Sequence, residues 1–506
     1  MASSALPGCA QSQSADTPAY EAANNEQVAS VRAASYDIQI SLDTDGNRME
    51  QVVEMNINND GSKDLDALYL RYYPYGYVPF LISEWPEGNE GKSAAITSVT
   101  RDGTADQLPF ASDAGDNTLV KVDLSDSPLK VGESLILQVN AWTDLPILRG
   151  RFGTSVFDEG KLFSLTFCFP YLEYMKNGEW YLDPASFELE NRNPELADYH
   201  VTVEAPDTFT VVGPGTVQQD GTLTTIDAKD LRSLAVFASD CMGVDAFEVQ
   251  GISISNCYLN VGDVENYRML TRQYLTDAFD SFIELVGPYH RDCFTMVEGC
   301  SNMEFSGVAI INGDFFYDGE VEGYQDRFAH LVHEVGHQWF YDAVGNHEYR
   351  EGWIDEGFTS YLTDSEIACR DSESLRMVGE IYPEGNALEA NIAEREMVRM
   401  GLEGDLVGLD HYYLNSQEDK ESISTVMGIE REFMFPGQLP DHFYSALFLA
   451  QLKDAMGDEE FYAFVRDVYE TYLQKIADTE GIKQILLEHD DSDEVKELVS
   501  FYLLTS

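Results

Sequence analysis

Two histidines and two glutamates stand at spacings that allow them to serve one metal ion. The segment His333–His337 has the sequence His-Glu-Val-Gly-His, and eighteen residues then separate His337 from Glu356. Residues four apart lie on the same face of an α-helix, so His333 and His337 can bind one ion together. Glu334 follows the first histidine and can hold a water molecule beside the ion. Glu356 offers a carboxylate as the third protein ligand.

These ligands predict a catalytic zinc site rather than a structural one. His-Glu-x-x-His on a helix is a known zinc-binding pattern in which the glutamate acts as general base. Three protein ligands leave the fourth position of a tetrahedral ion open for water or substrate. Histidine is scarce here, nine in 506 residues, which makes a chance match rare. We therefore expect one Zn²⁺ on His333, His337 and Glu356; the alternative is a surface helix with two solvated histidines.

Two predicted helices position these residues. Apolar residues on both sides of the motif predict an amphipathic helix around His333 and His337. Gly336 costs about 1 kcal/mol relative to alanine inside a helix, so its presence predicts close packing near the metal. A second helix is expected from about Ile354 to Arg370, with Glu356 in its first turn.

The whole chain has room for two or three domains. We expect a leader and linker over residues 1–30, a β-sheet domain over 31–250 and a catalytic domain over 251–506. Short runs of alternating apolar and polar residues between turn clusters predict the β-sheet domain. In the second half a strand region is expected at Phe294–Ile311, and helical spacing predicts helices at Val264–Val286, Glu389–Met400, Phe443–Met456, Glu459–Lys475 and Glu494–Leu504.

The charge balance excludes one class of partner. Ninety acidic residues against 31 basic ones give a net charge of −59, whereas nucleic-acid binding relies on Lys and Arg. Such an excess predicts a strongly solvated surface, as in an exported or salt-adapted protein. The sequence contains no run of 18 apolar residues, so no membrane-spanning segment is expected.

The cysteines suggest a location and a redox state. Leu-Pro-Gly-Cys ending at Cys9, before a polar stretch, resembles the end of a bacterial lipoprotein signal. Either that signal was trimmed, which implies a lipid anchor and an extracellular or cell-surface location, or Cys9 is incidental. The other six cysteines lack Cys-x-x-Cys spacing, which argues against a zinc ribbon. They are expected to be buried thiols, with disulfides Cys241–Cys257 or Cys293–Cys300 as alternatives.

Three segments of the chain resemble the aminopeptidase N family of gluzincin metallopeptidases. His333–Tyr361 follows the family pattern throughout, and Met303-Glu304 matches the core of the family's G-x-M-E-N strand. The segment His442–Phe461 is similar to the family's Y-x-K-G-A helix and the G-D-E-x-F turn after it. The likeness covers about residues 255–475.

This resemblance implies an N-terminal saddle-like β domain followed by a thermolysin-like α/β catalytic domain that is mostly helical. It implies a zinc aminopeptidase of the short bacterial type, which lacks the C-terminal helical-repeat domain. Glu334 would take a proton from the zinc-activated water and deliver it to the leaving amine. Glu304, beside Met303, would bind the free α-ammonium of a peptide and so limit cleavage to its first residue.

One departure from the family pattern leaves alternatives open. The family has a catalytic tyrosine where this chain has His442; Tyr444 lies two residues on, and Tyr412 and Tyr413 are weaker candidates. Losing one oxyanion donor costs roughly 3 kcal/mol of barrier. One alternative is therefore an exported peptide-binding protein that keeps zinc without turnover. Another is a gluzincin endopeptidase in which Glu304 binds no amine.

Two further expectations concern the surroundings of the site. Asp364 or Glu366 on the second helix either orients a ligand histidine or lies on a solvated face. The strand around Gly299–Met303 is expected to pair with an extended substrate backbone, as edge strands do.

Overall fold

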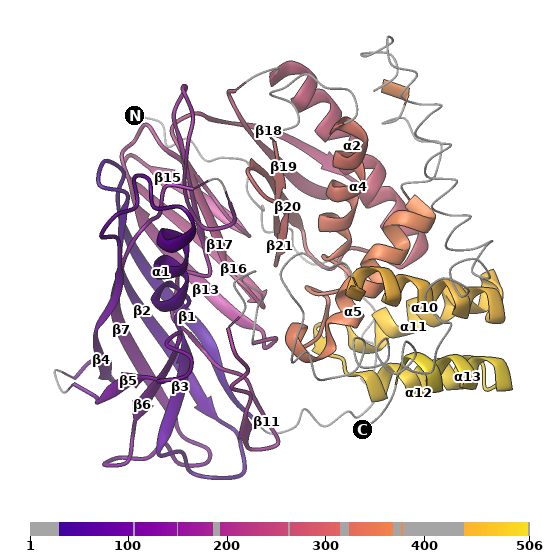
Figure 1. Cartoon of the computed structure of the whole chain (residues 1–506), viewed down its shortest axis with the longest axis horizontal. Coiled ribbons are helices and arrows are strands. Elements are labelled where there is room, and N and C mark those ends of the chain that lie inside the picture. Colours follow the sequence, from indigo (N-terminus) through magenta and orange to yellow (C-terminus); the bar gives the residue numbers. More distant parts are fainter. Residues whose placement is uncertain are drawn as a thin grey trace. The chain divides into compact units, whose positions relative to one another are not determined.

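The computed structural model describes residues 30–104, 107–148, 150–185, 193–261, 264–313, 323–367, 376–377 and 440–503. The side chains of residues 323–328, 364–365 and 440–444 lie outside this description. The chain forms two compact units, Met1–Met242 and Gly243–Ser506 (Figure 1). Cys9 lies outside the described residues, so the lipid anchor and the extracellular location stay predictions.

The first unit is built mainly from strands, as expected. Along paired strands every second side chain is buried, for example Ile38 and Ile40 on β1 and Val53 and Met55 on β2, because successive side chains point to opposite faces. Its largest sheet has the order β15 (Thr216–Asp220), β16 (Leu223–Leu231), β13 (Ala197–Glu204), β1 (Val31–Asp43), β2 (Arg48–Asn59), β7 (Ser134–Asp144) and β4 (Ala94–Arg101).

Smaller sheets and one helix complete this unit. The helix α1 (Pro74–Glu84), which the strand pattern did not predict, has a proline in its first turn. One four-stranded sheet has the order β10 (Tyr171–Leu172), β3 (Ala67–Arg71), β6 (Leu119–Asp123) and β5 (Phe110–Ser112). Another has the order β14 (Thr210–Val212), β17 (Ala235–Ser239), β9 (Lys161–Thr166) and β8 (Gly153–Val156), and a two-stranded ribbon pairs β11 (Met175–Lys176) with β12 (Glu179–Trp180).

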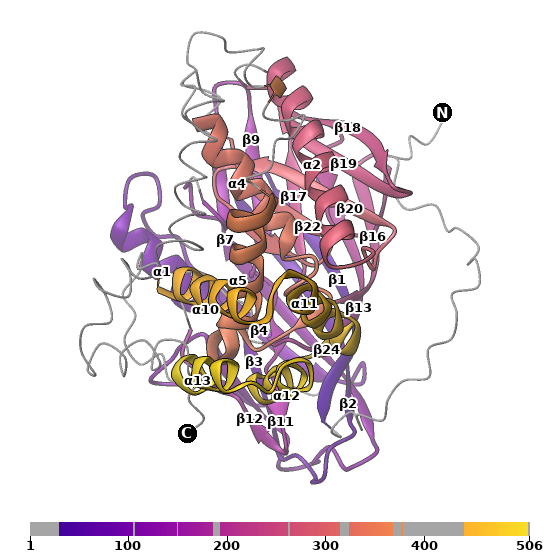
Figure 2. The ribbon, with the colours of Figure 1, turned by 90° about the vertical axis from the view of Figure 1, so that its right-hand side faces the viewer.

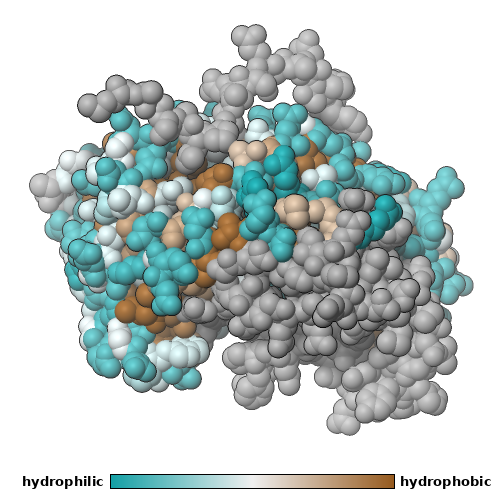
Figure 3. Space-filling model, turned by 90° about the horizontal axis from the view of Figure 1, so that it is seen from above, coloured by the Kyte–Doolittle hydropathy of each residue, from teal (hydrophilic) through white to brown (hydrophobic). Residues whose placement is uncertain are grey.

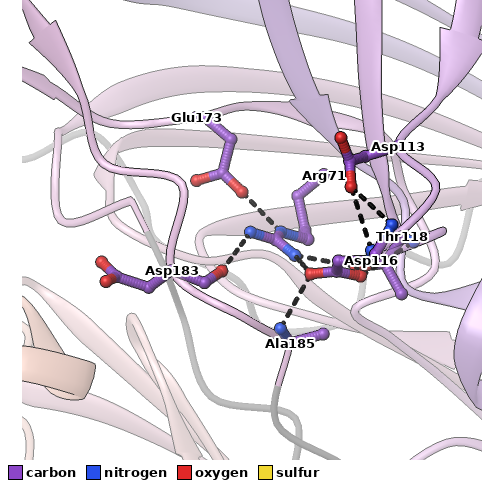
Figure 4. Close-up of polar contacts among 8 residues, drawn as sticks. Arg71, Asp113, Asp116, Thr118, Glu173, Asp183 and Ala185 are labelled. Carbon is purple, nitrogen blue, oxygen red and sulfur yellow. Dashed lines mark hydrogen bonds and ion pairs between the residues drawn. The ribbon is translucent and has the colours of Figure 1, made fainter.

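A buried ion-pair cluster around Arg71 joins several segments of this unit (Figure 4). The fully buried guanidinium lies 2.5 Å from Glu173 and 2.6 Å from Asp116, and it donates to the backbone oxygen of Asp183 at 2.7 Å. Burial alone would raise the pKa of Asp116, but the hydrogen bond from Thr118 and the charge of Arg71 lower it. Buried charges are tolerated only when paired in this way, so the cluster fixes how these segments meet.

The second unit begins with a five-stranded sheet. Its order is β18 (Met242–Val249), β19 (Ile252–Leu259), β20 (Cys293–Gly299), β22 (Val308–Asn312) and β21 (Met303–Phe305). The pairs β19–β20 and β20–β22 are parallel, whereas β21 runs antiparallel to β22 at the edge. The two units divide between residues 242 and 243, at the start of β18, which pairs with β19.

Helices make up most of the rest of this unit, which agrees with the expected fold class. In this unit α2 (Val264–Leu285) packs against β19, and α4 (Gly323–Gly336) packs against β22 (Figure 2). Aromatic rings pack beside α2, where Phe282 is stacked on Trp339, three residues after the end of α4, at 5.0 Å between ring centroids. The helices are α2 (Val264–Leu285), α4 (Gly323–Gly336), α5 (Glu348–Tyr361), the π-helix η1 (Leu362–Ile367), α10 (Pro440–Met456), α11 (Asp458–Tyr472), α12 (Thr479–His489) and α13 (Asp493–Tyr502); β23 (Val344–Gly345) pairs with β24 (Lys475–Ile476).

Some predicted boundaries need correction. The second metal helix starts at Glu348, six residues before Ile354, and a kink at Glu351 divides it. Glu356 therefore lies five residues beyond the kink rather than in the first turn of a helix from Ile354. Helix α12 was missed, and the helix predicted at Glu389–Met400 lies outside the described residues.

The expected buried thiols are confirmed at Cys168, Cys241, Cys257 and Cys300, which excludes both alternative disulfides, Cys241–Cys257 and Cys293–Cys300. The expectation is wrong at Cys293, which is disulfide-bonded.

The surface agrees with the acidic composition. Hydrophilic residues cover much of the coloured face in Figure 3, with smaller apolar groups between them. Among the residues that the structure describes, no helix has both the length and the apolar character needed to cross a membrane.

Candidate metal centre

The three predicted metal ligands come together in the second unit. Nε2 of His333 lies 3.0 Å from Nε2 of His337, and Oε2 of Glu356 lies 3.3 Å and 3.6 Å from these two nitrogens. Ligand atoms around a tetrahedral zinc ion with bonds of about 2.0–2.1 Å are separated by roughly 3.3 Å. The donor set and its spacing therefore fit one zinc ion. Within the described part of the chain, this is the one such group of histidine, cysteine and acidic side chains.

The end of α4 presents both histidines to the same point. His333 lies in the last turn of α4, and His337 is the first residue after the helix ends at Gly336. The backbone N–H of His337 still donates to the carbonyl of His333 at 3.2 Å. The helical turn thus continues through His337, and the spacing of four residues brings the rings to one face, as predicted.

Two glycines let the helices around the site approach closely. A Cβ atom on Gly336 would lie 2.6 Å from Cζ of Phe282 on α2 and 2.9 Å from Cγ2 of Thr359 on α5. A Cβ atom on Gly357, next to Glu356, would lie 2.6 Å from Cβ of Ser445 on α10. The close packing expected at Gly336 is confirmed, and Gly357 plays the same part between α5 and α10.

The orientation of His337 is fixed by a backbone carbonyl. Nδ1 of His337 lies 3.1 Å from the carbonyl oxygen of Phe340 and, at the longer distance of 3.5 Å, from Oγ1 of Thr359. Because a carbonyl oxygen can only accept, Nδ1 carries the hydrogen, and the lone pair of Nε2 is directed to the ligand position. The side chain of His337 is 1% exposed, whereas those of His333 and Glu356 are 20% and 22% exposed. The site is thus closed behind His337 and open to solvent on the side of the other two ligands.

A buried ion pair supports the turn that follows His337. The carboxylate of Asp342, which is fully buried, accepts two hydrogen bonds from Arg291, at 2.6 Å from Nε and 2.7 Å from Nη2. Nε2 of His290 lies 3.2 Å from the same carboxylate. Burial alone would raise the pKa of Asp342, but the neighbouring Arg291 and His290 hold it well below its ordinary value. Sequence spacing gave no signal for these residues, since 51 positions separate Arg291 from Asp342.

The side chain of Gln338, two residues after the end of α4, forms hydrogen bonds with β21 and the turn that follows it. Its side-chain nitrogen donates to the carbonyl of Phe305 at 3.0 Å, and its oxygen accepts from the N–H of Gly307 at 2.9 Å. These bonds hold the turn between β21 and β22 against the residue that follows His337. Met303 and Glu304 are buried on β21, so the predicted substrate residues are joined to the metal ligands through Gln338.

The expected peptide-pairing strand is only partly right. β20, which ends at Gly299, is paired on both sides, by β19 and β22, and has no open edge. Of the predicted stretch Gly299–Met303, only Met303 belongs to the edge strand β21.

For the remaining predicted site residues, the structure gives the position in the chain and few side-chain contacts. Glu334 is buried on α4 directly after His333. His442 and Tyr444 are the third and fifth residues of α10, but their side chains, like that of Asp364, lie outside the described residues. The identity of the oxyanion donor thus stays a prediction. Tyr412 and Tyr413 also lie outside the described residues.

Glu366 is neither a histidine partner nor a solvated residue. Its carboxylate lies 2.5 Å from Nζ of Lys453 on α10 and accepts from the hydroxyl of Tyr361 at 3.3 Å. Side chains of Glu366 and Lys453 are 13% and 14% exposed. Glu366 therefore joins η1 to α10.

Comparisons with known proteins match this architecture. Residues 299–502 match the model of the Peptidase family M1 domain, which confirms the resemblance inferred from the motifs. Aminopeptidase O of Homo sapiens is 24% identical over 178 residues, which are 33% of this chain and 20% of that protein. The chain thus spans about a fifth of this relative.

Solved structures share the fold over nearly the whole chain. The M1 zinc metallopeptidase from Deinococcus radiodurans has a TM-score of 0.58 and 14% identity, and the match covers 94% of both chains. A mutant of that metallopeptidase bound to a Tyr-Ser-Ala substrate has a TM-score of 0.55 and 15% identity, covering 94% of this chain and 95% of the other. At this identity the likeness shows a common fold.

Proposed function

Residues 299–502 of this chain form a peptidase family M1 domain, and from that premise we propose that the protein is a zinc-dependent aminopeptidase. The observation that carries the proposal is the convergence of His333, His337 and Glu356, whose ligand atoms lie within 4.8 Å of one another. Aminopeptidase O, a relative by sequence, carries the same activity in its name.

The proposed chemistry divides between the metal and a buried glutamate. A zinc ion, when bound, supplies a Lewis acid for the scissile carbonyl and lowers the pKa of water. Glu334, which follows His333 on α4, takes a proton from the attacking water and passes it to the leaving amine. Glu356 serves as a ligand, since its Oε2 lies 3.3 Å from Nε2 of His333.

Glu304 on the edge strand β21 supports a preference of the enzyme for the free N-terminus of a peptide. Glu304 is 6% exposed on β21, and a buried carboxylate gains from a cationic partner. A free α-ammonium group supplies such a charge at the first residue of a peptide. The backbone of the peptide would pair with β21, which is the edge strand of this sheet among the described residues. The Tyr-Ser-Ala substrate bound to the Deinococcus protein of similar fold supports a peptide ligand.

One paired assay tests this function against its two alternatives. Peptides of one sequence are compared with the N-terminus free and N-acetylated, on protein loaded with zinc. We expect hydrolysis of the free peptides and loss of most of the rate on acetylation. Equal rates on both forms would assign an endopeptidase, whereas bound zinc with peptide binding and no turnover would assign the binding protein.

A further inference from the structure

We infer that the Arg291–Asp342 ion pair is a positioning device for the metal ligand His337, because it holds a strained turn whose carbonyl orients the imidazole. The inference rests on the proposed function only in taking His337 as a zinc ligand. The geometry behind it consists of a strained residue, the bonds that hold it, and the carbonyl that it presents.

The strained residue is Tyr341. Its backbone φ is +131°, a region that L-residues other than glycine rarely occupy. The residue is 2% exposed, so its side chain is enclosed by the core as well. Such a conformation persists only where the surrounding structure over-determines it.

Four hydrogen bonds around Tyr341 provide that constraint. The N–H of Tyr341 donates to the carbonyl of Val344 at 3.0 Å, and the N–H of Asp342 donates to the carbonyl of His337 at 2.9 Å. The two bonds from Arg291 then fix the side chain of Asp342 from a segment 51 residues away in the chain. A bidentate guanidinium constrains direction as well as distance, so the ion pair resists rotation of the turn.

The turn presents the carbonyl of Phe340 to the metal ligand. That oxygen lies 3.1 Å from Nδ1 of His337 and belongs to the residue directly before Tyr341. If the turn relaxed toward an ordinary φ, the peptide between Phe340 and Tyr341 would rotate and withdraw the acceptor. His337 would lose its shorter Nδ1 bond and keep only the 3.5 Å contact with Oγ1 of Thr359, a hydroxyl that can donate or accept and so does not set the tautomer. Changes to such partners of metal-bound histidines lower metal affinity by roughly 10- to 100-fold.

Zinc affinity, measured by competition with a chromophoric chelator, tests the inference without any assay of hydrolysis. Arg291→Lys keeps the charge but loses the bidentate fork, and Asp342→Asn keeps the shape but loses the charge. We expect both to weaken zinc binding by roughly 10- to 100-fold. Arg71→Lys in the first unit is the matched control, since Arg71 is also a buried arginine between carboxylates. It should lower the unfolding temperature and leave zinc affinity unchanged.

A second substitution separates the strained turn from simple loss of packing. Glycine adopts positive φ without strain, so Tyr341→Gly should remove the need for the ion pair. In the Arg291→Lys background it should restore part of the zinc affinity, even though losing the buried ring lowers the stability of the metal-free protein. Asp342→Asn gives the answer if Arg291→Lys does not fold.

Two outcomes would overturn the inference: wild-type zinc affinity in both single variants, or no recovery with Tyr341→Gly. If the wild-type protein itself did not bind zinc, that result would instead contradict the proposed function.

Discussion

Glu356 places a carboxylate oxygen 3.3 Å from Nε2 of His333 although the two side chains come from different helices. The separation is set by how α4 and α5 pack, and Gly336 marks the point of close approach, since a Cβ there would meet Thr359 of α5 at 2.9 Å. The positions of these side chains thus depend on the packing of the apolar core around α4 and α5.

Removing the metal should therefore cost stability without unfolding the protein. A ligand that binds only the folded state stabilises it by about 2.7 kcal/mol at 100 times its Kd. We expect a chelator to lower the unfolding temperature of the second unit while the far-ultraviolet circular dichroism stays unchanged at room temperature. Loss of helical signal on chelation would show that the site forms only with its ion.

Substituting the proposed base should stop the chemistry and spare the metal. Glu334→Gln keeps the size of the side chain but removes its ability to accept a proton. We expect kcat to fall by roughly 10²- to 10⁴-fold, the usual contribution of a general base, with zinc content unchanged. Full turnover in this variant would remove Glu334 from the mechanism.

Glu304 should govern the requirement for a free N-terminus. Hydrogen bonds to charged groups contribute about 1.5–3 kcal/mol, so Glu304→Gln should lower kcat/KM for free peptides by roughly 10- to 100-fold. The residual rate on N-acetylated peptides should not fall with it. An equal loss on both kinds of peptide would point to damage of the strand rather than to loss of ammonium binding.

The glycine between the metal histidines should not tolerate a methyl group. Gly336→Ala would press a Cβ to within 2.6 Å of Phe282 and 2.9 Å of Thr359, and overpacking of this kind costs typically about 1–3 kcal/mol. We expect a lower free energy of unfolding in urea, together with weaker zinc binding as α4 moves from α5. Adding Phe282→Leu, which replaces the obstructing ring with a smaller side chain, should recover part of the stability. A fully stable Gly336→Ala protein would argue against close packing here.

A pH effect is expected where α11 meets α12. Nδ1 and Nε2 of His489 lie 2.6 Å from Glu460 and 2.8 Å from Asp467. Burial lowers the pKa of His489, but the two carboxylates outweigh it and raise the pKa above its ordinary value of 6.5. A raised pKa stabilises the folded state below the ordinary value, and that gain is lost as pH rises through the raised one.

Stability measured against pH checks this sign. The free energy of unfolding of His489→Gln should fall below that of the wild type at about pH 6, and the gap should close toward about pH 9. A gap that stays the same across this range would mean that His489 contributes packing and no charge.

The candidate metal ligands could be found from the sequence because their signal is local. A spacing of four residues sets His333 and His337 on one face whatever surrounds them, and the helix at Val264–Leu285 follows from apolar residues at helical spacing. The strand alternation of the first unit is equally local, so the fold class emerged from periodicity and from the family resemblance together.

The missed features depend on contacts between distant segments. Arg291 and Asp342 meet across 51 residues, and no spacing rule pairs them. The start of α5 was misplaced because the kink at Glu351 interrupts the helical period before Ile354. Tyr341 gives no warning of its positive φ, since a bulky residue is the last type that sequence reasoning would place there.

The central claim is that His333, His337 and Glu356 hold a zinc ion that hydrolysis requires. Its most direct test is to measure zinc content and aminoacyl-amide turnover on one purified sample, before and after chelation and again after zinc is restored. We predict one zinc per chain, turnover that disappears with the metal, and recovery in proportion to the zinc regained. Turnover that survives complete removal of zinc, or a protein that binds none, would contradict the assignment.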